Sequence, residues 1–147
     1  MKIAPSDAKY LQKNAQGSVY DYATAQLAVQ KATSPALYNY GLMLLDDHAR
    51  LNKMLGQLAH QRHLSLPLIM EDKDTQILKQ LTSQSGGAFD KAIVAEFVKI
   101  NGDDVRDGLK ELSTTKDPQV RRIVGEFVRV EQKHLRGARA LKTKLGA

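Results

Sequence analysis

The chain has 147 residues, a length that corresponds to one domain with a sizeable apolar core. It contains no cysteine, which excludes disulfides, thiolate metal sites and cysteine nucleophiles, and only 5% of its residues are aromatic. The formal net charge is +6, and no apolar run approaches the roughly 20 residues that a membrane-spanning helix requires. Abundant Ala, Leu, Lys and Gln favour helices over strands.

The first predicted helix ends at a short break. We expect Ser6 or Asp7 to cap this helix, which should run to about Ala32. After the break, Ser34 followed by Pro35 is typical of an N-cap and the first helical residue. The sequence therefore predicts a tight turn between two consecutive helices.

The second helix is predicted to span 35–63 and to precede the longest interruption of the chain. Its inward face has the alternating three- and four-residue spacing of a helix, at Leu37, Gly41, Leu44, His48, Leu51, Leu55 and Leu58. Residues 64–87 form the interruption, because Pro67 prevents a continuous helix and two glycines end the segment. Within it, Asp74 can cap a short helix that ends near Ser83.

Two further long helices complete the pattern. The third should run from about Ala88 to Thr114, and Asp117 before Pro118 repeats the N-cap-plus-proline start for the fourth. The inward face of the fourth helix is Val120, Ile123, Phe127, Val130, His134, Ala138, Leu141 and Leu145. Four long helices, two tight turns and one long connection predict a single all-α domain over 1–147, an antiparallel four-helix bundle with a short helix between the second and third.

Four polar side chains interrupt the apolar faces near the middle of the long helices. They are Asp21, His48, Asn101 and His134. Because equal distances from a tight turn mean equal heights, at about 1.5 Å per residue, the four should meet in one central layer. A buried polar group without a partner costs roughly 1–3 kcal/mol. The layer should therefore be a metal or ligand site, the remnant of one, or a closed hydrogen-bond network.

The residue types in this layer would suit a mononuclear metal site. The candidate ligands are Asp21, His48, His134 and, in place of a water, Asn101. Two imidazoles and a carboxylate suit a single Zn²⁺, Fe²⁺, Mn²⁺ or Cu²⁺ ion. A di-iron centre is not expected, because only Glu131 and His134 have Glu-x-x-His spacing, which makes Glu131 one further candidate. The alternative is a metal-free network of neutral histidines, which would weaken the protein below about pH 6.

Several short stretches resemble a family of exported bacterial ferritin-like proteins of unknown function. They are LQKNAQG at 11–17, LAVQKATSP at 27–35, DDH at 46–48, LSLP at 64–67, FD at 89–90 and HL at 134–135. The resemblance implies a ferritin-like bundle in the periplasm with an inward Glu/His metal constellation. In that family position 21 is often Glu and position 101 is often His, so this chain differs at both. The segment from Met1 to Pro5 has no hydrophobic signal region, so we expect any signal peptide to have been removed.

The positive charge is concentrated in the last helix. From Lys116 onward there are nine Lys and Arg residues against three acids. This face would either meet an anionic surface or remain solvated, and nucleic acid is not expected because no aromatic residues are interleaved. No phosphate loop, serine elbow or paired-acid motif is present. We therefore expect a non-enzymatic exported protein with an envelope partner. The alternative is a mononuclear metal-binding or weak redox protein.

Overall fold

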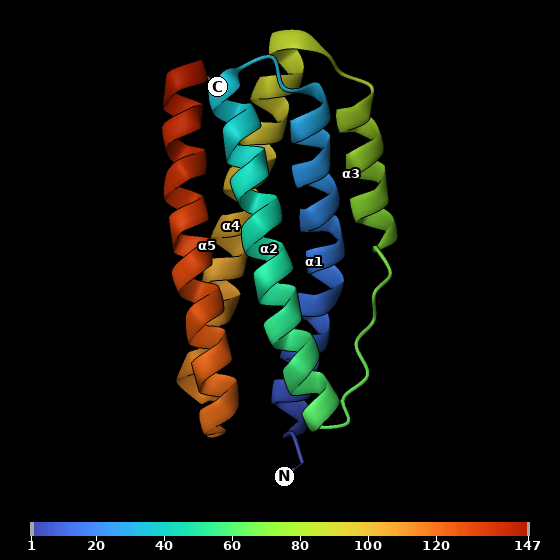
Figure 1. Ribbon diagram of the computed structural model, residues 1–147, viewed down its shortest axis with the longest axis vertical. Coiled ribbons are helices and arrows are strands. Elements are labelled where there is room, and N and C mark those ends of the chain that lie inside the picture. Colours follow the sequence, from blue (N-terminus) through green and yellow to red (C-terminus); the bar gives the residue numbers. More distant parts are fainter. Residues whose placement is uncertain (1, 147) are drawn as a thin grey trace.

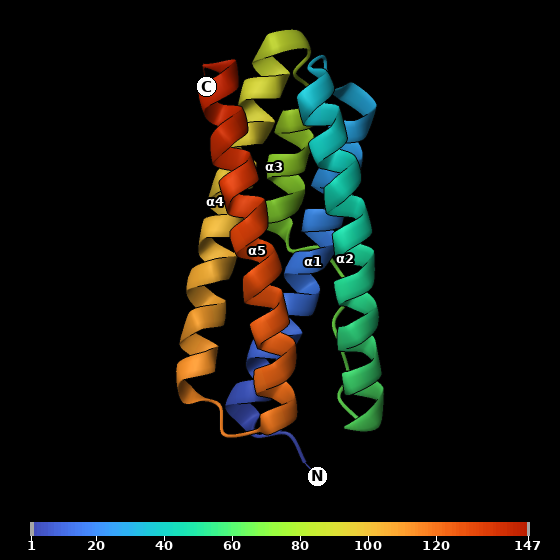
Figure 2. The same cartoon turned by 60° about the vertical axis from the view of Figure 1, so that its left-hand side comes forward.

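The computed structural model describes residues 2–146, so Met1 and Ala147, the ends of the predicted domain, lie outside the described residues. Within this range the chain forms five α-helices and no β-strand: α1 (Pro5–Lys31), α2 (Pro35–Gln61), α3 (Asp72–Thr82), α4 (Gly86–Thr114) and α5 (Pro118–Leu145). The four long helices lie side by side along the long axis, and the short α3 packs outside them against α1 and α4 (Figures 1 and 2). The predicted all-α class is confirmed.

The connection between α2 and α3 sets the direction of the helices. α1 rises, α2 descends, and residues 62–71 climb along the outside of the bundle to α3, after which α4 descends and α5 rises (Figure 1). As a result α2 and α4 run in the same direction, while α1 with α2 and α4 with α5 form two antiparallel hairpins. The most extensive helix packing lies within these hairpins. No helix among residues 2–146 has both the length and the hydropathy to cross a bilayer.

Two predicted helix starts are confirmed by their capping bonds. The Ser34 hydroxyl accepts a hydrogen bond from the backbone N of Leu37 at 3.4 Å. The Asp117 carboxylate accepts from the backbone N of Gln119 at 3.0 Å and of Val120 at 3.3 Å. In both cases the next residue is a proline, which begins a helix without needing a partner for its missing N–H.

The start of α1 differs from the prediction. Ala4 occupies the N-cap and Pro5 the first helical position, so neither Ser6 nor Asp7 caps the helix. The Asp7 carboxylate instead accepts a hydrogen bond from the Thr115 hydroxyl at 3.0 Å, which ties α1 to the turn between α4 and α5. A buried carboxylate with a distant partner is not distinguishable from a cap in the sequence alone.

Three other bounds differ from the prediction by two or three residues. α2 ends at Gln61 rather than His63, and α4 begins at Gly86 rather than Ala88. The N-cap of α3 is Glu71 rather than Asp74. The early end of α2 has a clear cause, because His63 has a φ of 54°, in the left-handed region that a continuing helix cannot use.

The apolar core is divided into two clusters by the central layer. On α2, Leu37 and Leu44 belong to the cluster near the C-terminal end of α5, whereas Leu51 and Leu58 belong to the other. His48 lies between the two sets. All the residues predicted for the inward face of α2 are buried, so that prediction is confirmed.

Asp90 connects the two hairpins at the upper end of the bundle. Its buried carboxylate accepts hydrogen bonds from the backbone N and the hydroxyl of Thr33, at 3.0 and 2.6 Å, and from the backbone N of Ser34 at 3.0 Å. The tight turn between α1 and α2 is therefore held by a side chain from α4.

Candidate functional site

His48 and His134 meet in the central layer, as their heights predict. Their ring centroids are 5.5 Å apart and the rings are inclined by 45°. The two side chains are 7% and 0% exposed. Burial lowers the pKa of both below the ordinary 6.5, to about 4 for His48. Both imidazoles are therefore neutral at pH 7.

His134 is oriented by Asp47. Its Nε2 atom lies 2.8 Å from Oδ2 of Asp47, which also lies 2.8 Å from Nζ of Lys133. Although partial burial opposes its ionisation, hydrogen bonds from Lys133 and His134 hold the pKa of Asp47 below its usual value. Because Nε2–H donates to this carboxylate, Nδ1 of His134 keeps its lone pair. That atom is buried and has no hydrogen-bond partner.

Asn101 reaches the layer through Tyr40. Its Nδ2 donates to the carbonyl of Phe97 at 2.8 Å and lies 3.5 Å from Oη of Tyr40. The Tyr40 hydroxyl in turn donates to the backbone carbonyl of His134 at 2.7 Å. A hydrogen-bond network is present here, but it differs from the predicted metal-free alternative, in which the histidine rings themselves bond to Asp21 and Asn101.

Asp21 faces Asp104 of α4 instead of hydrogen-bonding to the histidines. Burial, together with the neighbouring carboxyls of Asp104 and Glu131, raises the pKa of Asp21 well above its ordinary value. Burial also raises the pKa of Asp104 to about 7, although its hydrogen bond with Asp21 acts in the opposite direction. The two carboxyls share a proton near neutral pH. Sequence reasoning missed Asp104, which lies one turn after Asn101, and that spacing could have pointed to it.

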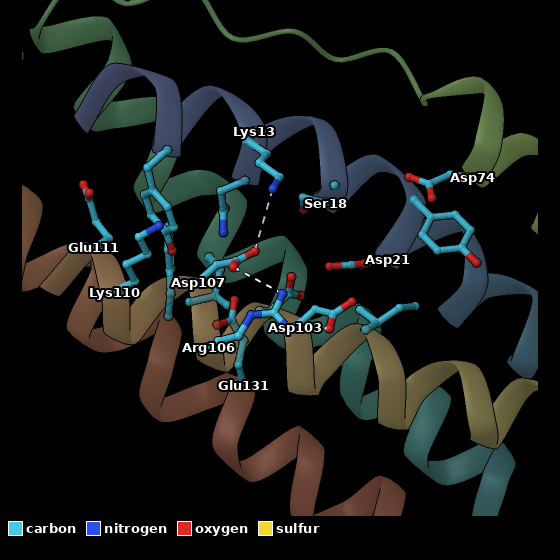
Figure 3. Close-up of a pocket in the computed structure, with 18 of the residues that line it drawn as sticks. Lys13, Ser18, Asp21, Asp74, Asp103, Arg106, Asp107, Lys110, Glu111 and Glu131 are labelled. Atoms are coloured by element: carbon cyan, nitrogen blue, oxygen red, sulfur yellow. Dashed lines mark hydrogen bonds and ion pairs between the residues drawn. The ribbon is translucent and has the colours of Figure 1, made fainter. Parts of the chain in front are cut away.

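A cleft of about 710 Å³ opens between α1 and α4 and reaches this layer (Figure 3). Its lining includes Asp21, Asp104, His48 from α2 and Glu131 from α5. Glu131 is 4% exposed, and its Oε2 atom has no hydrogen-bond partner. Burial and then the charge of Asp104 raise the pKa of Glu131 well above its ordinary value. Glu131 and His134, one turn apart on α5, thus each carry an unpaired buried polar atom.

The predicted ligands form pairs rather than one cage. His48 stands with His134, Asp21 stands with Asp104, and Asn101 is bound to Tyr40. Among residues 2–146, no three His, Asp or Glu side chains are already arranged to hold a metal ion. Metal binding at this layer stays a prediction, and any ion would have to draw additional ligands toward the histidines.

The fold and this layer define an all-helical domain with a polar centre. The chain belongs to the DUF4142 family, a domain of unknown function, which it matches over residues 1–141. This confirms the predicted membership in a helical family of unknown role. No curated protein matches the chain.

Several solved structures share the fold. The chain is similar to a DUF305 fragment from Deinococcus radiodurans, with a TM-score of 0.85 and 10% identity over 99% of both chains. It is similar to CopM in its Cu(II)-bound form, with a TM-score of 0.81 and 15% identity over 98% of this chain and 99% of that one. The Ag-bound form of CopM gives a TM-score of 0.75 and 16% identity over 98% of each chain. At these identities the likeness shows the fold alone.

Proposed function

We propose that the protein is a non-enzymatic metal-binding protein that holds a copper ion in its central layer, between α2 and α5. The observation that carries this proposal is the Nδ1 atom of His134, which is buried and unpaired while Nε2 of the same ring is bound to Asp47. Metal-binding histidines have this arrangement, because a carboxylate on one ring nitrogen fixes the tautomer and leaves the other nitrogen free to coordinate.

His48 and Glu131 are the proposed additional ligands. The neutral ring of His48 is already beside that of His134, and the unpaired Oε2 of Glu131 lies one turn away on α5. Because no three-ligand cage is already formed, Glu131 has to rotate toward the rings, and water completes the coordination. In this proposal Asp21 and Asn101 remain outside the coordination sphere, since Asp104 and Tyr40 already hold them.

Three further points support copper and a ferritin-like class. Imidazole nitrogens suit copper, zinc and iron better than magnesium or calcium. CopM, whose structures include Cu(I)-, Cu(II)- and Ag-bound forms, has the same fold. One long crossover connection is the connectivity of ferritin-like bundles.

An exported, periplasmic location and an envelope partner rest on the family resemblance, and the basic face of α5 fits an anionic surface there.

Metal titration of the untagged protein tests this proposal. We expect one equivalent of copper per chain, measured by isothermal titration calorimetry and by mass spectrometry of the desalted complex. His134→Gln and His48→Gln should abolish binding, and Asp47→Asn should weaken it about 10- to 100-fold by releasing the orientation of His134. His60→Gln is the matched control, because it removes an exposed imidazole from the same helix. Equal losses in His60→Gln and His134→Gln, or no copper bound by the wild type, would overturn the proposal.

A further inference from the structure

The cleft between α1 and α4 is rich in acids although the protein is basic. Nine carboxyl groups and six Lys or Arg side chains line it, whereas the whole chain has a net charge of +6. We propose that this cleft binds a linear polyamine, an aliphatic chain with two or more ammonium groups, as a ligand separate from the metal ion. The following features of the cleft support this class of ligand.

Four of the six cations in the lining form ion pairs with acids of the cleft, and Figure 3 shows those of Lys13 and Arg106. Nζ of Lys13 lies 3.9 Å from Asp107, and Nζ of Lys99 lies 3.8 Å from Asp103. The guanidinium of Arg106 contacts both of these aspartates, at 3.2 and 3.4 Å. These rim pairs are solvent-exposed, and none of them includes Asp21, Asp104 or Glu111.

The inner carboxyls have no cationic partner. Asp21, Asp104 and Glu111 all line the cleft, and no Lys or Arg among residues 2–146 forms an ion pair with any of them. Glu111 is 6% exposed, its carboxyl faces that of Asp7, and its Oε2 atom has no other hydrogen-bond partner. The Oη atom of Tyr10, also in the lining, is unpaired as well. Buried polar atoms in native proteins normally have partners, and ammonium N–H groups would supply strong ones to a carboxylate.

The size and the spacing point to an extended organic cation. A volume of about 710 Å³ falls in the usual range for small-molecule sites and is far larger than a metal ion needs. Asp104 and Glu111 are seven residues apart on α4, which separates them by about 10 Å along the helix. The terminal ammonium groups of an extended linear polyamine can span such a distance. Its methylene segments would lie against Tyr10 and Phe127, which also line the cleft.

Calorimetric titration of spermidine into the metal-free full chain at low ionic strength tests the inference. We expect saturable one-site binding. Asp104→Asn and Glu111→Gln should each weaken it at least tenfold, because each removes a carboxyl that a bound ammonium group would hold ionised, while keeping the shape of the side chain. Asp103→Asn is the matched control, since it removes an exposed rim acid from the same helix, and it should change the affinity less than twofold.

Further measurements distinguish a failure of this inference from a failure of the proposed copper site. His134→Gln, which should lose copper, should keep the wild-type affinity for spermidine. Absence of saturable binding at millimolar spermidine would overturn the inference. Equal losses in Asp103→Asn and Asp104→Asn would also overturn it, because they would indicate diffuse charge attraction. If Mn²⁺ or Mg²⁺ displaces spermidine at equal concentration, the cleft is a divalent-cation site and the polyamine inference is wrong.

Discussion

The carboxylate of Asp47 lies 2.8 Å from Nε2 of His134, whereas the next residue, His48, lines the cleft. Neighbouring residues on a helix point about 100° apart. One turn of α2 therefore provides both the group that orients His134 and the ring that stands beside it. Because their side chains diverge, Asp47 and His48 cannot both bind the same ion. Instead, Asp47 can orient His134 while His48 acts as a ligand.

The stability of the metal-free protein should rise as the pH falls from 8 to about 5.5. Folding raises the pKa of Asp104 from 3.8 to about 7 and that of Glu111 from 4.5 to about 7, so the folded state binds more protons in this window. This stabilisation is lost as the pH rises through the pKa values that the two carboxyls have in the folded state. Folding lowers the pKa of His48 from 6.5 to about 4, which acts in the opposite direction. Folding also raises the pKa of Asp21 and of Glu131. The effect of the four carboxyls on stability is therefore larger than the opposite effect of the two histidines.

Urea unfolding midpoints between pH 5.5 and 8 measure this dependence. The double variant Asp104→Asn/Glu111→Gln should lose most of the rise in stability at low pH, because fewer carboxyls then offset the destabilising protonation of the histidines. The double variant His48→Gln/His134→Gln should show a steeper rise in stability as the pH falls. The loss below about pH 6 that the histidines alone predict should not occur in the wild type, and a steady weakening from pH 7.5 to 5.5 would contradict the carboxyl assignment.

Replacing Asp90 should weaken the whole bundle. Asp90→Ala removes three hydrogen bonds and leaves two backbone N–H groups of the turn at Thr33 and Ser34 without this partner. A loss of about 3 kcal/mol in the free energy of unfolding is expected from charged hydrogen bonds of this kind. Asp46→Ala, at an exposed position of α2, should stay within about 0.5 kcal/mol of wild type. Similar urea midpoints for the two variants would argue against this role.

The two capped helix starts should differ in their contribution to stability. Asp117 caps α5 and also forms two contacts of 2.8 and 2.9 Å with Arg62, and both side chains are less than a tenth exposed. Asp117→Ala should cost about 3–5 kcal/mol, because it breaks a buried ion pair as well as a cap. Ser34→Ala removes only a cap and should cost about 1 kcal/mol. Chemical denaturation of both variants compares them directly, and equal costs would mean that the ion pair contributes nothing.

Alanine substitutions at two glycines of α4 should change the stability of the protein in opposite directions. A Cβ atom at Gly108 would lie 2.5 Å from Cγ2 of Val128, so Gly108→Ala forces α4 and α5 apart and should cost about 1–3 kcal/mol. A Cβ atom at Gly102 meets nothing within 4 Å, so Gly102→Ala should stabilise the helix by about 0.5–1 kcal/mol. Thermal unfolding would show one midpoint lowered and the other raised, and a raised midpoint for Gly108→Ala would contradict the close packing.

The helices and the height of the central layer could be predicted from the sequence. The hydrogen-bond partners within the layer could not. Residue spacing gives height along a helix, and it brought His48 and His134 together correctly. It does not give the rotation of each helix against its neighbours. Asp21 has the right height, yet it faces Asp104, and Asn101 faces Tyr40.

The cleft was missed for a different reason. Apolar periodicity finds the faces that helices bury against one another, but it does not detect a face that two helices leave apart. On the lower half of α4, the side toward α1 carries Asp103, Asp104, Asp107 and Glu111 in place of apolar residues. This run of acids was visible in the sequence. Its meaning depended on knowing that α1 lies opposite.

The crossover connection has a consequence for how the chain assembles. Each hairpin joins consecutive helices, so it can form from residues that are close in sequence, with little loop entropy to overcome. Docking of one hairpin on the other then brings Thr33 within reach of Asp90, 57 positions later. The central layer draws residues from both hairpins, so it closes only at that last step. Until then water has access to the carboxyls and imidazoles that the finished bundle encloses.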